Sequence, residues 1–157
     1  MAATIEGLEA LVGRLEAMPG KLTAALGDEA ARLGEALRAA VERNLSGAVL
    51  QQRSGRLASS IDVSIERTGS AVSATVGSDV PYAAIHEYGG VIPAHEILPK
   101  SARALAFPWQ GRERFFKRVE LPAVQMPERS FMRSALAEMA PEIRAAMAAA
   151  ANRAVTS

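Results

Sequence analysis

The feature that most constrains the fold is a change in the spacing of apolar residues near residue 57. Before it, apolar residues recur every three or four positions, as on one face of a helix. After it, two runs alternate apolar with polar residues, separated by the turn residues Thr68-Gly69-Ser70. The apolar positions of the two runs are Leu57, Ile61, Val63, Ile65, Val72, Ala74 and Val76. This alternation predicts an antiparallel β-hairpin, and the two spacings together indicate the α+β class.

Two helical stripes precede the hairpin. The first runs over residues 4–18 and the second over residues 22–45. Because Pro19-Gly20 lies between them, we expect the helix to be interrupted there. These apolar stripes pack on the protein's own sheet or bind a partner, and the two roles are compatible.

A further helical stripe begins at Phe131 and continues to Met139. Pro141 lacks the backbone donor that a helix interior needs, so the helix is expected to kink or restart there. Residues 142–155 are rich in alanine, which favours helix but offers little apolar bulk. We expect this end to dock weakly or fray.

The middle of the chain supplies the remaining elements. Pro81 suits the first position of a short helix over residues 81–88, which Gly89-Gly90 would end. After an extended excursion over residues 91–100, residues 104–109 and 114–121 read as a second strand pair. The expected fold is one α+β domain, 1–157, with an antiparallel sheet of about four strands within residues 55–121. N-terminal helices over residues 1–45 and a C-terminal helix over residues 128–155 flank that sheet.

Composition excludes several classes of protein. The 157 residues suit one domain, and the formal charge of +1 is far from the basic excess of proteins that bind nucleic acid through phosphates. With no cysteine, the chain has no disulfide and no thiolate. Neither a signal peptide nor the ~20-residue apolar run of a membrane helix is evident, so we expect a soluble protein.

Two His-Glu pairs, His86-Glu87 and His95-Glu96, are the features closest to a catalytic or metal site. A zinc-protease helix needs two histidines four residues apart, but Gly90 stands four residues after His86. We therefore favour structural or interface histidines over metal ligands. The chain also lacks a Gly-x-Ser-x-Gly elbow and a phosphate-binding glycine loop. We expect no enzyme, no catalytic or metal-binding residues and no cofactor.

Residues 100–118 are locally basic, with six Lys or Arg residues against Glu113 alone. Such a segment suits nucleic acid or an acidic partner, although strands also carry charges on a solvent-facing side. Trp109, Phe115 and Phe116 are expected to fill a core or an interface rather than stack on bases. A nucleic-acid-binding module thus stays open as an alternative.

Three segments together resemble a known family. They are Arg53-Ser-Gly-Arg-Leu-Ala-Ser-Ser-Ile61, Val76-Gly-Ser-Asp-Val-Pro-Tyr-Ala-Ala-Ile-His-Glu-Tyr-Gly-Gly90 and Pro127-Glu-Arg-Ser-Phe-Met-Arg-Ser-Ala-Leu136. In order and content they are similar to the tail-completion family of tailed bacteriophages, whose members are also described as virion morphogenesis or minor tail proteins. The chain departs from the family pattern at Glu128 and Ser130, and its excursion over residues 91–109 is longer than in many members.

The resemblance implies a structural protein of the head–tail neck, in a phage or a phage-like particle. Copies of the chain would form a ring that completes the tail tube and joins it to the head, with sixfold symmetry on the tail side or twelvefold nearer the portal. The implied partners are other copies, the tail tube protein and a stopper or adaptor protein. Genomic DNA would pass through the channel without sequence-specific binding. The implied locations are the virion neck and, during assembly, the host cytoplasm, with no membrane contact. Another neck ring, a stopper or adaptor, is the nearest alternative.

The predicted assembly contacts centre on residues 82–90. Tyrosine and histidine offer amphipathic surface suited to a subunit or tail-tube contact. Arg53, Arg56 and Lys100 are expected to line the channel or bridge neighbouring copies. The complete interface prediction is Tyr82, His86, Glu87, Tyr88, Gly89, Gly90, Arg53, Arg56 and Phe131.

Overall fold

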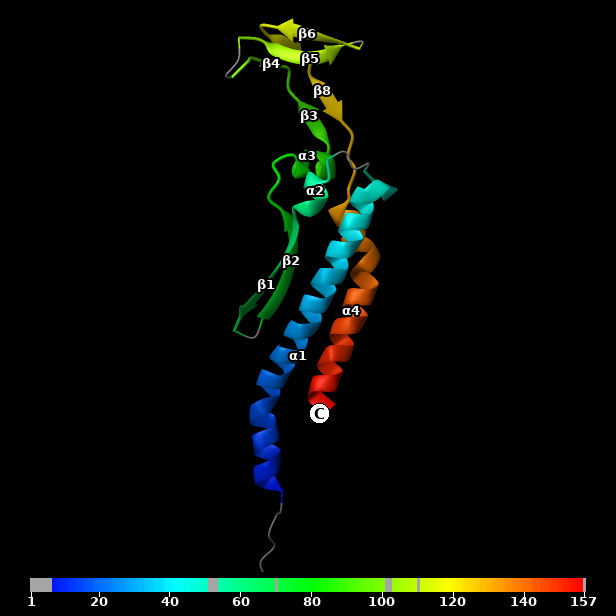
Figure 1. Ribbon diagram of the computed structural model, residues 1–157. Coiled ribbons are helices and arrows are strands. Elements are labelled where there is room, and N and C mark those ends of the chain that lie inside the picture. Colours follow the sequence, from blue (N-terminus) through cyan, green and yellow to red (C-terminus); the bar gives the residue numbers. More distant parts are fainter. Residues whose placement is uncertain (1–6, 51–53, 70, 101–102, 110, 157) are drawn as a thin grey trace, which may run out of the picture. The chain divides into compact units, whose positions relative to one another are not determined.

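The computed structural model describes residues 7–50, 54–69, 71–100, 103–109 and 111–156. Two compact units form within the chain: unit 1 contains residues 1–83 and 130–157, and unit 2 contains residues 84–129 (Figure 1). This division into compact units does not test whether the chain is one domain, so the expectation of a single domain stays a prediction. The α+β class is confirmed, because long helices and antiparallel strand pairs occur together.

Unit 1 joins two long helices to one hairpin. Its elements are α1 (Leu8–Arg43), the π-helical turn η1 (Asn44–Ala48), α2 (Arg56–Ser59), β1 (Ile61–Thr68), β2 (Ala71–Ser78) and α4 (Met132–Thr156). Helix α1 lies beside α4 and also contacts both strands of the hairpin (Figure 1). The predicted hairpin is confirmed, with Ile61 opposite Ser78 and Thr68 opposite Ala71. Leu57, expected at the start of the strand, lies in α2 instead.

Helix α1 continues through Pro19, so the predicted interruption is wrong. The side chains around this proline are exposed or half-buried, so water can donate to the Leu15 carbonyl the hydrogen bond that Pro19, which lacks an N–H, cannot donate. Thr23 Oγ1 donates to the Pro19 carbonyl at 2.9 Å. Helix growth on both sides and packing farther along α1 outweigh the local cost of the proline, which is about 3 kcal/mol.

Helix α4 likewise continues through Pro141, and its alanine-rich end does not fray. Ala150 and Ala154 are buried against the rest of unit 1. Between them, Nη2 of Arg153 lies 3.9 Å from Oε2 of Glu29 in α1. A hydrogen bond from Arg32 holds the pKa of that Glu29 carboxyl below its usual range. The low apolar bulk of alanine therefore permits close approach of two helices instead of weakening the contact.

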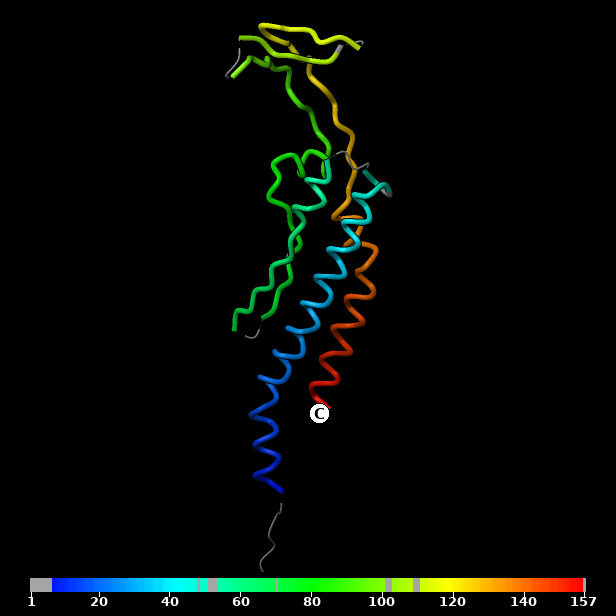
Figure 2. The backbone as a smooth tube through the Cα atoms, in the orientation of Figure 1, coloured from blue at the N-terminus to red at the C-terminus, as the bar shows by residue number. Residues whose placement is uncertain are grey.

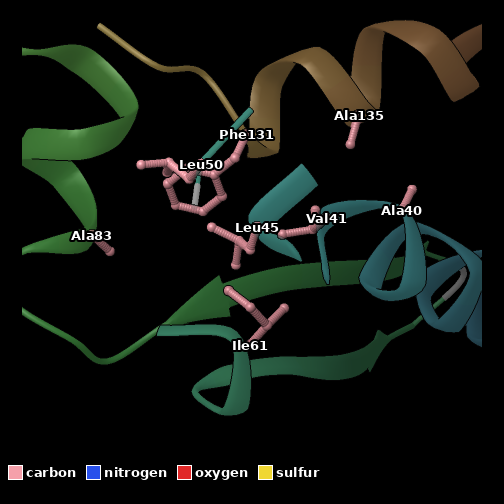
Figure 3. Packing of buried hydrophobic residues seen from close by; sticks show 8 residues of the cluster. All are labelled: Ala40, Val41, Leu45, Leu50, Ile61, Ala83, Phe131 and Ala135. Atoms are coloured by element: carbon pink, nitrogen blue, oxygen red, sulfur yellow. The ribbon is translucent and has the colours of Figure 1, made fainter. Parts of the chain in front are cut away.

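The core of unit 1 lies where α1, η1, β1 and α4 meet. Phe131 and Val41 are its most deeply buried large side chains, at 0% and 1% exposure. Figure 3 shows Phe131 among side chains contributed by several other elements. The labelled residues are Ala40, Val41, Leu45, Leu50, Ile61, Ala83, Phe131 and Ala135. The second predicted stripe of α1 thus packs on the chain's own elements, as expected.

The hairpin crosses α1 at a glycine. A methyl group added at Gly34 would lie 2.8 Å from Val63 Cγ1 and 3.4 Å from Ala74 Cβ. Gly13, nearer the start of the same helix, has open space around it. The hairpin can therefore approach α1 this closely because Gly34 has no side chain.

We expect Gly34→Ala to lower the free energy of unfolding by about 1–2 kcal/mol, because strain against Val63 exceeds the gain in helix propensity. Gly13→Ala, the matched control, should raise it by about 0.5–1 kcal/mol. Urea unfolding followed by circular dichroism measures both. Equal effects of the two changes would contradict the close approach.

Unit 2 is a long, interrupted β-hairpin that follows a short helix. The helix α3 (Ala83–Tyr88) begins at the last residue of unit 1. The strands are β3 (Gly90–Ile92), β4 (His95–Ile97), β5 (Leu105–Trp109), β6 (Arg112–Phe116), β7 (Val119–Leu121) and β8 (Val124–Met126). They pair as nested rungs, β3 with β8, β4 with β7 and β5 with β6 (Figure 2). We call residues 90–126 the arm.

The arm keeps one register through its first two rungs, in which Gly90 lies opposite Met126 and Ile97 opposite Val119. The register then shifts, because Ile97 pairs with Val119 whereas the next pair along the arm is Leu105 with Phe116. The predicted pair at residues 104–109 and 114–121 is present only in part. Strand β5 pairs with β6, but β7 pairs with β4, which lies in the segment 91–100 that was expected to be an extended excursion. In the described part of the chain, the strands form four two-stranded sheets and not one continuous sheet.

Candidate assembly surface

The predicted contact segment begins at a tight turn and ends at two glycines. Val80 is buried, and its carbonyl accepts a hydrogen bond from the Ala83 backbone at 3.0 Å. Helix α3 therefore begins at Ala83, two residues after the predicted start at Pro81. Gly89 and Gly90 have φ angles of 69° and 139°, which side-chain-bearing residues rarely adopt. The prediction that this glycine pair ends the helix through positive φ is confirmed.

Gly89 also has a packing role in unit 2. A methyl group added to it would lie 2.7 Å from the Glu128 backbone nitrogen and 3.0 Å from the Met126 carbonyl oxygen. Close by, the Arg129 backbone donates to the His86 carbonyl at 2.9 Å. Two of the segments that carry the family resemblance, distant in the sequence, therefore meet in space.

The residues of this segment differ in exposure. Tyr88 is 63% exposed and Tyr82 is 38% exposed, so both can contact another molecule. Glu87 is only 4% exposed, and His86 is half-buried. We therefore assign Glu87 to the interior of the fold, whereas each of the two tyrosines is exposed, as the predicted contact requires.

The other predicted contact residues belong to different units, to the core or to residues outside the description. Arg56 is exposed in unit 1 and Lys100 is exposed in unit 2, while Arg53 lies outside the described residues. Phe131 is fully buried in the core of unit 1, so its assignment to an interface is corrected. A side chain without exposed area stabilises the fold and cannot contact a second molecule in this state.

The two histidines lie in different elements of unit 2. His86 belongs to α3, whereas His95 is exposed on β4 with its Nδ1 3.0 Å from the Pro93 carbonyl. Within the part of the chain that the structure describes, no three His, Asp or Glu side chains gather as metal ligands would. The expectation that the protein is not an enzyme stays a prediction.

Sequence reasoning missed how much of the arm is open. Phe115 is 67% exposed, and Val91 and Leu98 are 58% and 57% exposed. The consecutive Phe115 and Phe116 were the available signal, because neighbouring strand residues point to opposite faces and a single core covers only one. Phe116 packs near Phe107, with ring centroids 6.2 Å apart, which leaves Phe115 on the other face.

The basic segment forms the outer part of the arm. Arg118 forms two ion pairs, with Nη2 at 2.7 Å from Oε1 of Glu120 and Nη1 at 3.4 Å from Oε1 of Glu96. The other five cations of residues 100–118 make no ion pair with any described residue. These five are Lys100, Arg103, Arg112, Arg114 and Lys117. The arm thus combines exposed apolar side chains with concentrated positive charge.

Comparisons with known proteins give one match. A family model described as the phage virion morphogenesis family matches residues 30–151. Searches of curated proteins and of solved structures gave no match. The matched range includes the hairpin, α3, the arm and most of α4. Separately, none of the described helices combines the length and apolarity that crossing a bilayer requires.

Proposed function

The chain belongs to the phage virion morphogenesis family, and from that premise we propose that it is a structural subunit of the head–tail neck. In this proposal, copies of the chain form a closed ring that completes the tail tube and joins it to the head. The neighbours are the tail tube protein and a stopper or adaptor protein. Genomic DNA passes through the channel, and the subunit itself catalyses no reaction.

The observation that carries this proposal is the amount of apolar surface left open in both units. Leu8, Leu11 and Leu15 of α1 are each more than half exposed, as are Val91 and Phe115 of the arm. Large open apolar surfaces of this kind mark protein–protein contacts. They suit a subunit that is completed by its neighbours better than an enzyme built around one cleft.

Tyr82 and Tyr88, together with His86, are proposed to contact a neighbouring subunit or the tail tube. Tyr and His each combine an apolar ring with a polar group, which suits a surface that is wet before assembly and buried after it. The glycine pair at the end of α3 holds this segment in a defined conformation.

Changing Tyr82, His86 and Tyr88 together to alanine should leave a folded protein that no longer forms rings. Light scattering after size-exclusion chromatography, with negative-stain images, measures assembly, and circular dichroism checks folding. Leu136→Ala with Val155→Ala, at 49% and 48% exposure on α4, is the matched control and should assemble. Intact rings from the triple variant would contradict the residue assignment, and a wild-type protein that forms no ring with its tail tube would contradict the neck role.

A nucleic-acid-binding module is the second candidate, favoured by the unpaired cations of residues 100–118. It requires binding of random duplex DNA that weakens steeply as salt rises, because phosphate contacts release counterions. A neck subunit through which DNA merely passes should bind such DNA weakly at physiological salt.

A further inference from the structure

The first ten residues of α1 extend beyond the packing of unit 1. Residues 8–17 are all exposed, whereas Ala30 and Leu33 farther along the helix are buried. Figure 1 shows this blue end of α1 continuing past the end of α4. Most of the stability of a helix comes from packing of its apolar face, and Gly13 lowers the helix propensity of this end. The first turns of α1 are therefore stabilised if another surface covers them.

An apolar stripe follows one face of this helix end. It consists of Leu8, Leu11, Val12 and Leu15, which have helical spacing and are 44–58% exposed. Because successive residues of a helix are about 100° apart around its axis, these four side chains lie within about 100° of one another. We call them the α1 stripe.

The two borders of the α1 stripe carry opposite charges. Glu9 and Glu16 lie about 90–110° to one side of its centre. Arg14 and Lys21 lie about 110–130° to the other side. All four residues are exposed, and none of them forms an ion pair with another described residue. The α1 stripe is therefore apolar with one acidic and one basic border.

Such a surface is complementary to a copy of itself, but only when the two helices run in the same direction. A rotation of 180° about an axis parallel to the helices brings the two stripes face to face and places each acidic border beside the basic border of the other copy. In register, Arg14 and Glu16 of the neighbouring copy then differ in height by about 3 Å. Antiparallel helices would instead place acidic borders together and basic borders together, which is destabilising.

The arm does not offer the same match. Its exposed Phe115 shares a face with Glu113, because the two residues are two positions apart on β6. The cations Arg112 and Arg114 lie on the other face with Phe116. An apolar centre between an acidic and a basic border is found on α1 itself, so charge complementarity favours a second copy of α1 as the occupant.

We propose that the first turns of α1 from neighbouring copies pack side by side in the same direction, with their α1 stripes together and Arg14 of one copy beside Glu16 of the next. This inference rests on the proposed ring and names one contact between its copies. Helices that run the same way are related by a rotation axis parallel to them, as in the cyclic symmetry of a closed ring. An antiparallel contact would close at two copies.

The absence of native cysteine allows a direct test. Leu8→Cys and Leu15→Cys are made as separate variants, checked for folding by circular dichroism, and treated with a short bismaleimide under assembly conditions. Each variant alone should give several-fold more cross-linked dimer than Ala17→Cys, because parallel helices place identical positions side by side. Ala17 is the matched position, since it is exposed on the opposite face of the same helix end.

The charged borders provide a second readout. Adding Arg14→Glu to Leu8→Cys makes both borders acidic and should reduce the cross-linked dimer several-fold, whereas Arg14→Lys should preserve it. Rising salt should also reduce the yield, because charges at the surface are screened. Equal yields from the Arg14→Glu and Arg14→Lys proteins would overturn the charge match.

The other outcomes assign the α1 stripe differently. More dimer from a mixture of the two cysteine variants than from either alone would show antiparallel helices, in which Leu8 lies near Leu15 of the other copy. Cross-linking of Leu8→Cys to the tail tube protein in place of a second copy would assign the stripe to that protein. Rings without an α1 cross-link would reject this contact and leave the proposed ring, whereas α1 dimers without rings would support the contact and reject the ring.

Discussion

Replacing Phe131 with alanine is expected to lower the free energy of unfolding of unit 1 by about 3–5 kcal/mol, the usual cost of removing a buried aromatic ring. Phe131 has no exposed area and lies in the cluster with Leu45, Leu50 and Ala83 (Figure 3). The change would leave a cavity where four elements meet. For a chain of this length, the thermal midpoint should fall by about 10 °C or more.

Urea unfolding followed by circular dichroism measures this effect. Leu136→Ala is the matched control, because Leu136 lies on the same helix but is 49% exposed, and it should cost less than about 1 kcal/mol. Phe131→Leu should fall between the two. A Phe131→Ala protein as stable as the control, but unable to assemble, would restore the interface role that the buried position argues against.

Replacing Gly89 with alanine should loosen the base of the arm by about 2–4 kcal/mol. Two costs combine here. The φ angle of 69° is unfavourable for alanine, and the new methyl group would lie 2.7 Å from the Glu128 backbone nitrogen. Backbone atoms cannot move aside as a flexible side chain can, so α3 and the strand that ends at Met126 must separate.

Gly111→Ala isolates the second cost, because Gly111 has a similar φ of 77° but open space around it. It should cost about 1–2 kcal/mol from the φ strain alone. Hydrogen exchange of the Arg129 amide, which donates to the His86 carbonyl, reports on the contact. We expect this amide to exchange about 100-fold faster in Gly89→Ala. Unchanged exchange there, or equal effects of both variants, would contradict the packing role.

Local chemistry in the sequence was enough to predict several elements. Alternation defines the hairpin of β1 and β2, because only one spacing places Ile61 and Val63 on the face toward α1. Glycine marks the end of α3 through a positive φ at Gly89, and Pro81 marks the turn that precedes its start at Ala83. These features depend on a few neighbouring residues, so no distant contact was needed to predict them.

The arm and the exposure of Phe115 could not be predicted from such local patterns. Residues 104–109 read correctly as a strand, but alternation alone does not show whether a strand joins a larger sheet. Whether Phe115 or Phe116 is the more covered side chain depends on which other residues of the folded chain lie nearby. The predicted contact at Tyr82 and Tyr88 rested on residue type and turn chemistry, and both side chains are exposed as that prediction required.

The sequence by itself determined the α+β class, the hairpin, the turn at Gly89-Gly90 and the family resemblance, because each depends on short local patterns of residues, which in the resemblance recur in a set order along the chain. Only the tertiary structure decided that α1 passes through Pro19, that the alanine-rich end of α4 is buried and that Phe131 belongs to the core. Each of those outcomes depends on free energy from contacts between distant segments, which outweighs the local preference of a proline or the low bulk of an alanine.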